Sequence, residues 1–321
     1  MVEAMRVLGW MVVLVGWMVV LVLVPLQALA QQPPPIIDMH LHVYPIGSLG
    51  PAGAPNPVTG KPSPETDDAM RREHLATLER YNIVLAVTSG CPFDLVRQWR
   101  EAAPERIIGA PYIAGGRGCW PAGDSLRQTH LAGELGVMGE FGLQYRGLSL
   151  SSPEAEPYLA LAEELDVPVA VHTGRGPPGA TYGCCPEFRA ALGNPLLIEE
   201  ALAQHPDLRV YIMHAGYPFI DETIALLHAH PQVYADVAVI NWILPREEFH
   251  RYLRRLVQAG FLDRLMFGSD QMIWPDAIGD AIESIESAEF LSEAQQRDIF
   301  YNNAARFLRL SDEEIARHHG R

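Results

Sequence analysis

The chain has 321 residues, of which 48% are hydrophobic and 20% are charged, a composition typical of a soluble enzyme. Its length suits one large barrel or two medium-sized domains. With 39 acidic and 24 basic residues the net charge is −15, and so acidic a body repels phosphate backbones, which argues against nucleic acid as a partner.

The first thirty residues differ from the rest of the chain. Arg6 precedes an uncharged run at 7–24, and Ala28-Leu29-Ala30 follows it. This order of basic end, apolar segment and small-x-small site predicts a signal peptide at 1–30, with a short linker at 31–35. The protein would then be periplasmic or secreted, without stable membrane contact. If the segment is retained, its apolar run is nearly long enough to anchor the chain in a membrane.

From residue 36 onward, short apolar runs alternate with amphipathic stretches. Strands are expected at 36–40, 83–88, 107–113, 137–141, 167–172, 209–214, 233–236 and 265–268. Helices are expected at 66–80, 93–102, 125–135, 154–165, 196–204, 221–230, 246–259 and 276–287. The pattern predicts an α/β fold over residues 36–310, a (β/α)8 TIM barrel with an extra C-terminal helix at 292–308 and a tail at 311–321. An open doubly wound sheet is less favoured, because no G-x-G-x-x-G follows the first strand.

Ionisable residues stand at or just after the ends of five predicted strands. Side chains two apart in a strand share a face, so the two histidines of the first strand converge. The ends of parallel strands surround one mouth of a barrel, and all six side chains should therefore meet there. Imidazole and carboxylate groups suit a divalent metal, with zinc favoured and manganese as the alternative. The predicted metal ligands are His40, His42, Glu140, His172, His214 and Asp270.

The same positions carry a family resemblance. H-x-H after the first strand, with VPVAVHTG, VYIMHAGYPF, LMFGSD and NNAARFL, resembles the amidohydrolase superfamily and in particular its amidohydrolase-related branch, amidohydrolase 2. The resemblance spans residues 36 to about 310 and implies a metal-dependent TIM-barrel hydrolase. In such an enzyme a metal-bound hydroxide attacks an ester, lactone, amide or similar bond of a small molecule. Asp270 would be the proton shuttle, and His214 would stabilise the oxyanion if it is not a ligand.

The segment GEFGLQY at 139–145 resembles the GEIGLD segment of TatD-like deoxyribonucleases, whose glutamate is a metal ligand. Many superfamily members carry a bridging carboxylated lysine at this place, and here Glu140 is the only candidate. If Glu140 bridges, the site holds two ions, one at each histidine pair. If it does not, one ion is bound by His40, His42, His172 and Asp270.

Three other functions compete with hydrolysis. The same branch contains non-oxidative decarboxylases of small aromatic carboxylic acids, which use one metal and an arginine for the substrate carboxylate. A TatD-like nuclease fits the Glu140 segment, but the acidic charge and the apparent export argue against it. A degenerate barrel kept as a binding protein would have lost a ligand, and all six are present. The sequence leaves the oligomeric state open, a homo-oligomer included.

Weaker candidates for substrate contacts follow the predicted strands. An arginine there can bind a carboxylate or phosphate, and an aromatic ring can line a pocket. These candidates are Arg146, Arg175, Tyr217, Trp242 and Trp274. The remaining histidines fall on predicted helices, their ends or the tail, and they are expected to face solvent; they are His74, His130, His205, His228, His230, His250, His318 and His319.

Export would allow the four cysteines to form disulfides. Bonds from Cys91 and Cys119 to the adjacent pair Cys184 and Cys185 are favoured, since the adjacent pair could close only a strained ring. Four unpaired, partly buried thiols are the alternative.

Overall fold

The computed structural model describes residues 33–114 and 119–320. The predicted signal peptide and the start of the predicted linker lie outside the described residues. Within the described part of the chain, no helix is long and apolar enough to cross a membrane.

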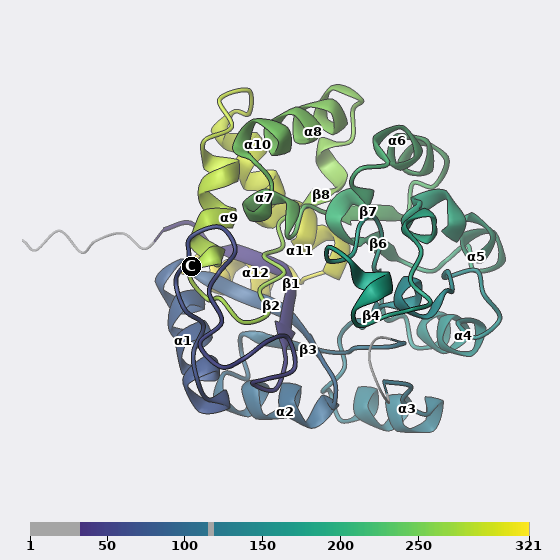
Figure 1. The fold of residues 1–321 in the computed structure, drawn as a ribbon. Helices are drawn as coiled ribbons and strands as arrows, with labels where there is room; N and C mark the ends of the chain where they lie inside the picture. Colours follow the sequence, from purple (N-terminus) through teal and green to yellow (C-terminus); the bar gives the residue numbers. More distant parts are fainter. Residues whose placement is uncertain (1–32, 115–118, 321) are drawn as a thin grey trace, which may run out of the picture. The chain divides into compact units, whose positions relative to one another are not determined.

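Eight strands run parallel and form a barrel, with helices around it (Figure 1). They are β1 (Ile36–Val43), β2 (Ile83–Gly90), β3 (Ile107–Pro111), β4 (Met138–Phe141), β5 (Val169–Val171), β6 (Val210–Ile212), β7 (Val233–Asp236) and β8 (Leu265–Met266). Continuous ladders join β1 to β3 and β4 to β8. Two contacts close the circle. Ile113 N donates to Glu140 O (2.8 Å) between β3 and β4, and Met39 N donates to Phe267 O (2.9 Å) between β1 and β8. The TIM-barrel prediction is confirmed.

The α-helices lie between and after the strands. They are α1 (Asp67–Arg80), α2 (Phe93–Ala102), α3 (Gly123–Leu131), α4 (Glu156–Glu164), α5 (Glu199–Gln204), α6 (Ile220–Ala229), α7 (Ile240–Ile243), α8 (Arg246–Gln258), α9 (Ala277–Glu286), α10 (Glu293–Arg297), α11 (Asn303–Leu308) and α12 (Asp312–His318). Short 3-10 turns are η1 (Leu143–Arg146), η2 (Ala180–Tyr182), η3 (Ala190–Gly193), η4 (Pro195–Ile198), η5 (Met213–Gly216) and η6 (Leu262–Arg264), and a π-helical turn, η7 (Asp298–Asn302), separates α10 from α11.

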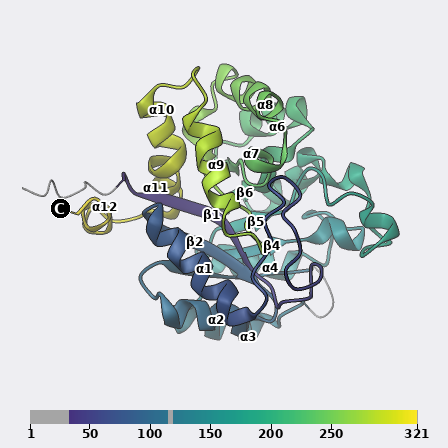
Figure 2. The ribbon, with the colours of Figure 1, turned by 60° about the vertical axis from the view of Figure 1, so that its left-hand side comes forward.

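The C-terminal segment is more ordered than a tail. Ser311 accepts a hydrogen bond from Glu314 N, and the Glu314 carboxylate accepts one from Ser311 N (2.7 Å). This capping box satisfies two backbone donors that a helix start would otherwise leave open, and α12 begins there. Figure 2 shows α12 beside the start of β1, at the opposite end of that strand from the long loop that follows it.

Two apolar layers hold the barrel together. Ile37, Val87 and Tyr211 belong to the cluster inside the barrel, and Phe141 and Val169 to the larger cluster between the strands and the helices. Alternating side chains of each strand supply the two layers. The inner cluster fills the barrel below the mouth, so the polar residues at the strand ends lie directly above a layer of apolar side chains.

The disulfide pairing differs from the one favoured by the sequence. Cys91 bonds Cys119, with Cα atoms 6.0 Å apart, and Cys184 bonds Cys185. Cys91 follows β2 and Cys119 lies in the loop after β3. Because β2 and β3 are neighbours, their loops meet at the mouth, whereas Cys184 and Cys185 belong to the loop after β5.

Two helix histidines are buried rather than exposed to solvent. His74 is fully buried on the apolar face of α1, where its Nδ1 lies 2.9 Å from Met70 O and burial lowers its pKa to about 4. His205 is 6% exposed and lies between Glu163 (2.9 Å) and Glu156 (3.1 Å) of α4. His74 packs against Trp99 of α2, and His205 is held by two glutamates of α4, contacts between helices that a helix position alone does not reveal.

Candidate metal centre

The six predicted ligands converge at the carboxyl ends of the strands. Each is at most 6% exposed to solvent, so the group forms one buried cluster. They come from β1, the segment after β8, β4 and the residues that follow β5 and β6. Four imidazoles and two carboxylates gathered without apolar neighbours between them are the donor set that divalent transition metals take in proteins.

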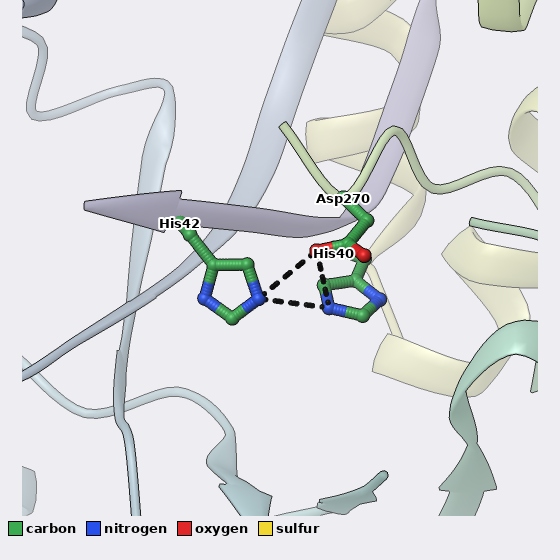
Figure 3. Close-up of side chains that lie close together, drawn as sticks. All are labelled: His40, His42 and Asp270. Carbon is green, nitrogen blue, oxygen red and sulfur yellow. Dashed lines mark hydrogen bonds and ion pairs between the residues drawn. The ribbon is translucent and has the colours of Figure 1, made fainter. Parts of the chain in front are cut away.

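One half of the cluster is built on β1. His40 Nε2 and His42 Nε2 lie 3.1 Å apart, and Asp270 Oδ1 lies 3.3 Å from the first and 3.1 Å from the second. Figure 3 shows the three side chains pointing at one another, two from β1 and one from the segment after β8. Ligands of a tetrahedral zinc ion at about 2.0–2.1 Å are themselves about 3.3 Å apart, so this triangle has the right size for one ion.

The other half is built on the ends of β4, β5 and β6. Glu140 Oε1 lies 2.8 Å from His172 Nδ1, and His172 Nδ1 lies 3.3 Å from His214 Nε2. The second carboxylate oxygen, Glu140 Oε2, faces the β1 half, 3.1 Å from His42 Nε2 and 3.5 Å from His40 Nε2. Glu140 therefore offers one oxygen to each half.

Local irregularities aim the ligands inward. The register between β1 and β2 shifts between Asp38 and Leu41, so Met39 stays in the interior cluster while His40 also faces the cluster of ligands. In β4 the register shifts at Gly139, whose φ of +127° suits glycine and whose added Cβ would lie 2.3 Å from Ala170 O. Such bulges re-aim side chains, here the Glu140 carboxylate.

Three of the predicted histidine ligands have their outer ring nitrogen, the one that faces away from the cluster, held by another group. His40 Nδ1 lies 3.1 Å from Asp236 Oδ2, and His42 Nδ1 lies 2.8 Å from Ser89 Oγ. His214 Nδ1 lies 3.1 Å from the carbonyl oxygen of Ala238. An outer acceptor fixes the ring proton on that nitrogen and leaves the inner nitrogen as a ligand. These partners were missed from the sequence, although Asp236 ends β7 and so carried the same strand-end signal.

Asp38 and Asp236 also tie the ends of the strands together. Asp38 Oδ1 accepts from His40 N (3.0 Å) and from Ser269 N (2.9 Å) after β8. Asp236 Oδ1 accepts from His214 N (2.8 Å). Burial raises the pKa of Asp38 to about 6, against the lowering effect of its hydrogen bonds. Both carboxylates hold backbone at or next to a predicted ligand.

The charges of the cluster call for a cation. Burial disfavours the charged imidazole of His40, but the carboxylates of Asp270 and Asp236 outweigh it and hold the pKa of His40 well above its usual value. Burial likewise opposes ionisation of Glu140, but hydrogen bonds from the histidines hold the pKa of Glu140 well below its usual value. Burial and the neighbouring His172 lower the pKa of His214 to about 4. The carboxylates are thus ionised and attract positive charge, which a divalent ion would supply.

The residues present fit a metal in three overlapping triads of close donor atoms. These are His40, His42 and Asp270; Glu140, His172 and His214; and His40, His214 and Asp236. The first two share no residue and together use all six predicted ligands. The third includes Asp236, whose contact with the outer nitrogen of His40 is that of a supporting group.

The side-chain contacts described for the five candidate substrate residues do not include any of the six predicted ligands. Arg146 is 46% exposed at its side chain and its Nε lies 3.7 Å from Glu187 Oε2, and the exposed Arg175 guanidinium lies 5.5 Å from the centre of the Tyr217 ring. The buried Trp242 donates to Ser269 O (2.8 Å), with its ring 6.3 Å from that of Trp274. Trp274 in turn donates to Ala54 O (2.9 Å), in the long loop after β1. The contacts of both tryptophans are with loops at the mouth.

Three tyrosines at the mouth were not predicted. The rings of Tyr44 and Tyr112 lie 5.1 Å and 5.9 Å from that of His42, and the hydroxyl of Tyr145 lies 3.3 Å from His172 Nε2. Burial raises the pKa of all three well above the usual value, so they stay neutral. They follow β1, β3 and β4 by one to four residues, a loop position that carries no periodic signal.

Comparison with known proteins bears on both fold and family. A family model described as amidohydrolase matches residues 37–310. A manganese-bound dihydroxybenzoic acid decarboxylase from a Polaromonas species is similar, with a TM-score of 0.60, 14% identity, and coverage of 88% of this chain and 99% of that one. A probable 2-pyrone-4,6-dicarboxylic acid hydrolase from Acinetobacter baumannii gives 0.59 at 18% identity, covering 86% and 99%.

An uncharacterised TIM-barrel protein from Bordetella bronchiseptica gives a TM-score of 0.64 at 19% identity, covering 89% of this chain and 100% of that one. At such identities these likenesses bear on the fold alone. The curated Protein fluG from Emericella nidulans is 22% identical over 161 residues, which cover 46% of this chain and 18% of that protein. The chain thus matches less than a fifth of the length of that relative.

Proposed function

Because the chain belongs to the amidohydrolase family and is an enzyme of that metal-dependent superfamily, we propose that it hydrolyses an ester, lactone, amide or similar bond of a small molecule, with two divalent cations held by the six clustered side chains. The observation that carries the proposal is the placement of Glu140. Its two oxygens face different histidine pairs, at 2.8 Å from His172 and 3.1 Å from His42, as a carboxylate shared by two ions must.

The assigned ligands divide into two sets. His40, His42, Asp270 and Glu140 Oε2 would hold one cation, and Glu140 Oε1, His172 and His214 the other. Zinc suits this nitrogen-rich donor set, and manganese is the alternative. When bound, such cations lower the pKa of a coordinated water and polarise the bond under attack.

One side chain of the protein, that of Asp270, is placed to transfer the proton during hydrolysis. Asp270 Oδ1 lies within 3.3 Å of two ligand nitrogens and its side chain is 9% exposed, so it borders the mouth from which water and substrate arrive. We propose that Asp270 accepts the proton of the attacking water and delivers it to the leaving group. If only one cation is held, His214 is free to donate to the developing oxyanion.

Hydrolysis is favoured over decarboxylation by the surroundings of the arginines. A decarboxylase would use an arginine to hold the substrate carboxylate, but the contacts described for Arg146 and Arg175 are with Glu187 and Tyr217. Small molecules remain the substrate class of the family. The two disulfides support export, since such bonds persist in oxidising compartments, and the mass of the mature N-terminus tests cleavage after Ala30.

The deciding experiment combines metal analysis with a substrate panel. The purified chain is assayed on aryl esters, lactones and aromatic carboxylic acids, with CO₂ release measured beside hydrolysis. Two metal ions per chain are expected, falling to one in Glu140→Gln, and Asp270→Asn should lower turnover by about 10²–10⁴-fold. Unchanged stoichiometry in Glu140→Gln would dismiss the bridge, and CO₂ release without hydrolysis would replace the proposed reaction by decarboxylation.

A further inference from the structure

His172 differs from the other ligating histidines in the partner of its outer nitrogen. Its Nδ1 lies 2.8 Å from Glu140 Oε1, and its Nε2 lies 3.3 Å from the hydroxyl of Tyr145. The other three outer nitrogens meet a carboxylate, a carbonyl or a serine. Only at His172 is the partner a phenol carried by an aromatic ring that packs against the imidazole, with centres 4.8 Å apart.

A hydroxyl can serve this imidazole in both of its states. When Nδ1 gives its lone pair to a cation, the ring proton sits on Nε2 and is donated to the Tyr145 oxygen. In the neutral imidazole without a cation, a proton on Nδ1 is donated to the Glu140 carboxylate, and Nε2 then accepts from the Tyr145 hydroxyl. A carboxylate or carbonyl could accept but not donate, so it would fit only the first state.

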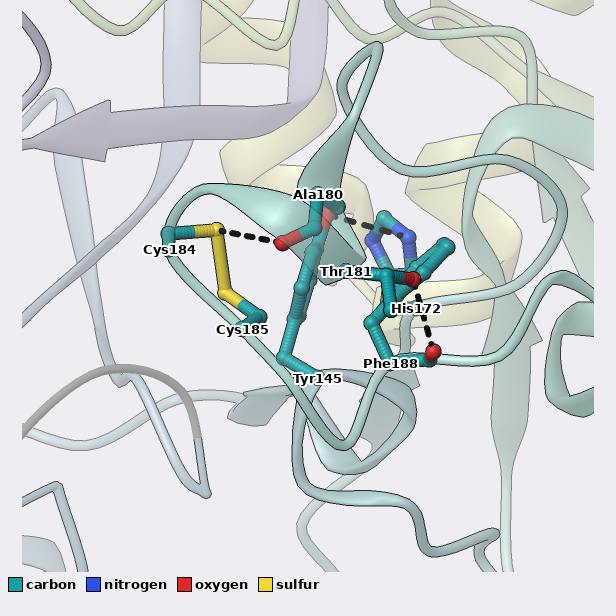
Figure 4. Close-up of a disulfide and its surroundings, with 7 residues drawn as sticks. All are labelled: Tyr145, His172, Ala180, Thr181, Cys184, Cys185 and Phe188. Carbon is teal, nitrogen blue, oxygen red and sulfur yellow. Dashed lines mark hydrogen bonds between the residues drawn. A yellow bond between two sulfur atoms is a disulfide. The ribbon is translucent and has the colours of Figure 1, made fainter.

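The loop after β5 holds Tyr145 in place. Figure 4 shows Phe188 and the Cys184–Cys185 disulfide, both carried by this loop, together with Tyr145 and His172. The Phe188 ring is 8% exposed and lies 5.5 Å from the Tyr145 ring. A Cβ added at Gly176 would lie 2.7 Å from the Phe188 ring and 3.2 Å from Tyr145, so the loop leaves no room for a larger residue there.

The base of the same loop is closed by hydrogen bonds. Gly174 N donates to Gly193 O (2.7 Å), and Gln144 Nε2 donates to Gly174 O (3.0 Å). Gln144 is buried and precedes Tyr145 in the chain. The loop and the residues after β4 are therefore one packed support behind the His172 imidazole.

We propose that Tyr145 is a positioning residue for His172, which it holds toward the cation position shared with Glu140 and His214 in both the loaded and the metal-free enzyme. Of the two measurements that test this role, the zinc titration rests on the proposed two-cation site, whereas the imidazole spectrum does not. The effect of Tyr145 is expected at that position, because the hydrogen bond and the ring contacts described for its side chain are with His172 and with Phe188 of the loop after β5. The β1 position, with His40 and His42, has its own partners in Asp236 and Ser89.

The test titrates the metal-free full-length chain with Zn²⁺ against a chromophoric chelator. His172→Asn, which loses a ligand, identifies the binding step of the affected cation. Tyr145→Phe keeps the ring and removes the hydroxyl, and it should weaken that step by about 10–100-fold while leaving the other step and the melting temperature unchanged. The matched control is Tyr182→Phe, a tyrosine of the same loop that is 94% exposed, which should change neither step.

A second measurement does not need a cation. In the metal-free chain, at a pH high enough to keep the imidazoles neutral, long-range ¹H–¹⁵N spectra report which nitrogen of His172 carries the proton. The wild-type signal should indicate a proton on Nδ1, and Tyr145→Phe should shift it, whereas Tyr182→Phe should not. If the wild type binds a single ion, the two-cation site fails and this spectrum still decides the role of Tyr145. Unchanged zinc affinity together with an unchanged His172 spectrum in Tyr145→Phe would overturn the proposal.

Discussion

The two disulfides should differ widely in what they contribute to stability. Cys91–Cys119 closes a loop of 28 residues, whereas Cys184–Cys185 joins neighbours in the chain and closes none. Restricting a loop of that length in the unfolded chain stabilises the fold by about 3.6 kcal/mol at 25 °C in the chain-entropy relation. With an unfolding entropy of about 2.1 cal/mol/K per residue, Cys91→Ala/Cys119→Ala should lower the melting temperature by about 6 °C.

Urea unfolding and calorimetry of three proteins test this difference. The double variant at Cys91 and Cys119 should lose most of that free energy, and the one at Cys184 and Cys185 should stay within about 1 kcal/mol of wild type. Alanine is chosen because Cys119 is 6% exposed and a serine hydroxyl would be buried there. Equal losses in the two variants, or a loss below about 1 kcal/mol at Cys91 and Cys119, would refute the reasoning from loop length.

Three further substitutions test two residues expected to support the metal site or the fold, Asp236 and His205, and one expected to support neither, Arg146. Asp236→Asn should weaken metal binding by about 10–100-fold, because the carboxylate holds two histidine ligands; chelator competition measures it, and unchanged affinity would count against a supporting role. Burial opposes the charge of His205, but Glu163 and Glu156 raise its pKa in the folded protein. The contribution of the charged His205 to the free energy of unfolding is therefore full below its unfolded pKa of about 6.5, and it is lost as the pH rises through the higher folded pKa. The difference in unfolding free energy between wild type and His205→Gln should therefore shrink from pH 6 to pH 9, and a constant difference would speak against the ion pairs. Arg146→Gln should leave metal content and turnover unchanged, since its ion pair is exposed; a tenfold loss of turnover would return it to the substrate site.

The convergence of the six predicted ligands could be foreseen because it requires only the barrel fold. Any residue at a strand's carboxyl end reaches the same mouth, so His172 and Asp270 could be assigned without knowing a register. The aim of Glu140 could not be predicted, because it depends on a register shift at Gly139 that a run of apolar letters does not reveal. Asp236 shows that the same rule was applied incompletely, since it ends β7 as plainly as the others end their strands.

Contacts between loops could not be predicted from the sequence for a different reason. The pairing of Cys91 with Cys119 and the packing of Phe188 on Tyr145 depend on how loops fold over the mouth. Loop paths are set by many weak contacts rather than by periodicity, so spacing alone gave a different cysteine pairing. The burial of His205 likewise depends on which helices lie side by side.

Asp270 and His40 are bound to each other through the backbone as well as through their side chains, since Asp270 N donates to His40 O (2.7 Å) across the seam where the first and last strands meet. His40 and His42 are therefore synthesised some 230 positions ahead of Asp270, the third member of their triad. During synthesis the chain contains the two imidazoles first, and the carboxylate of Asp270 joins them only when the barrel closes. Under the proposed assignment, the cation position of His40 and His42 is complete only after β8 has joined β1, and chain products that stop short of β8 are expected to lack that cation.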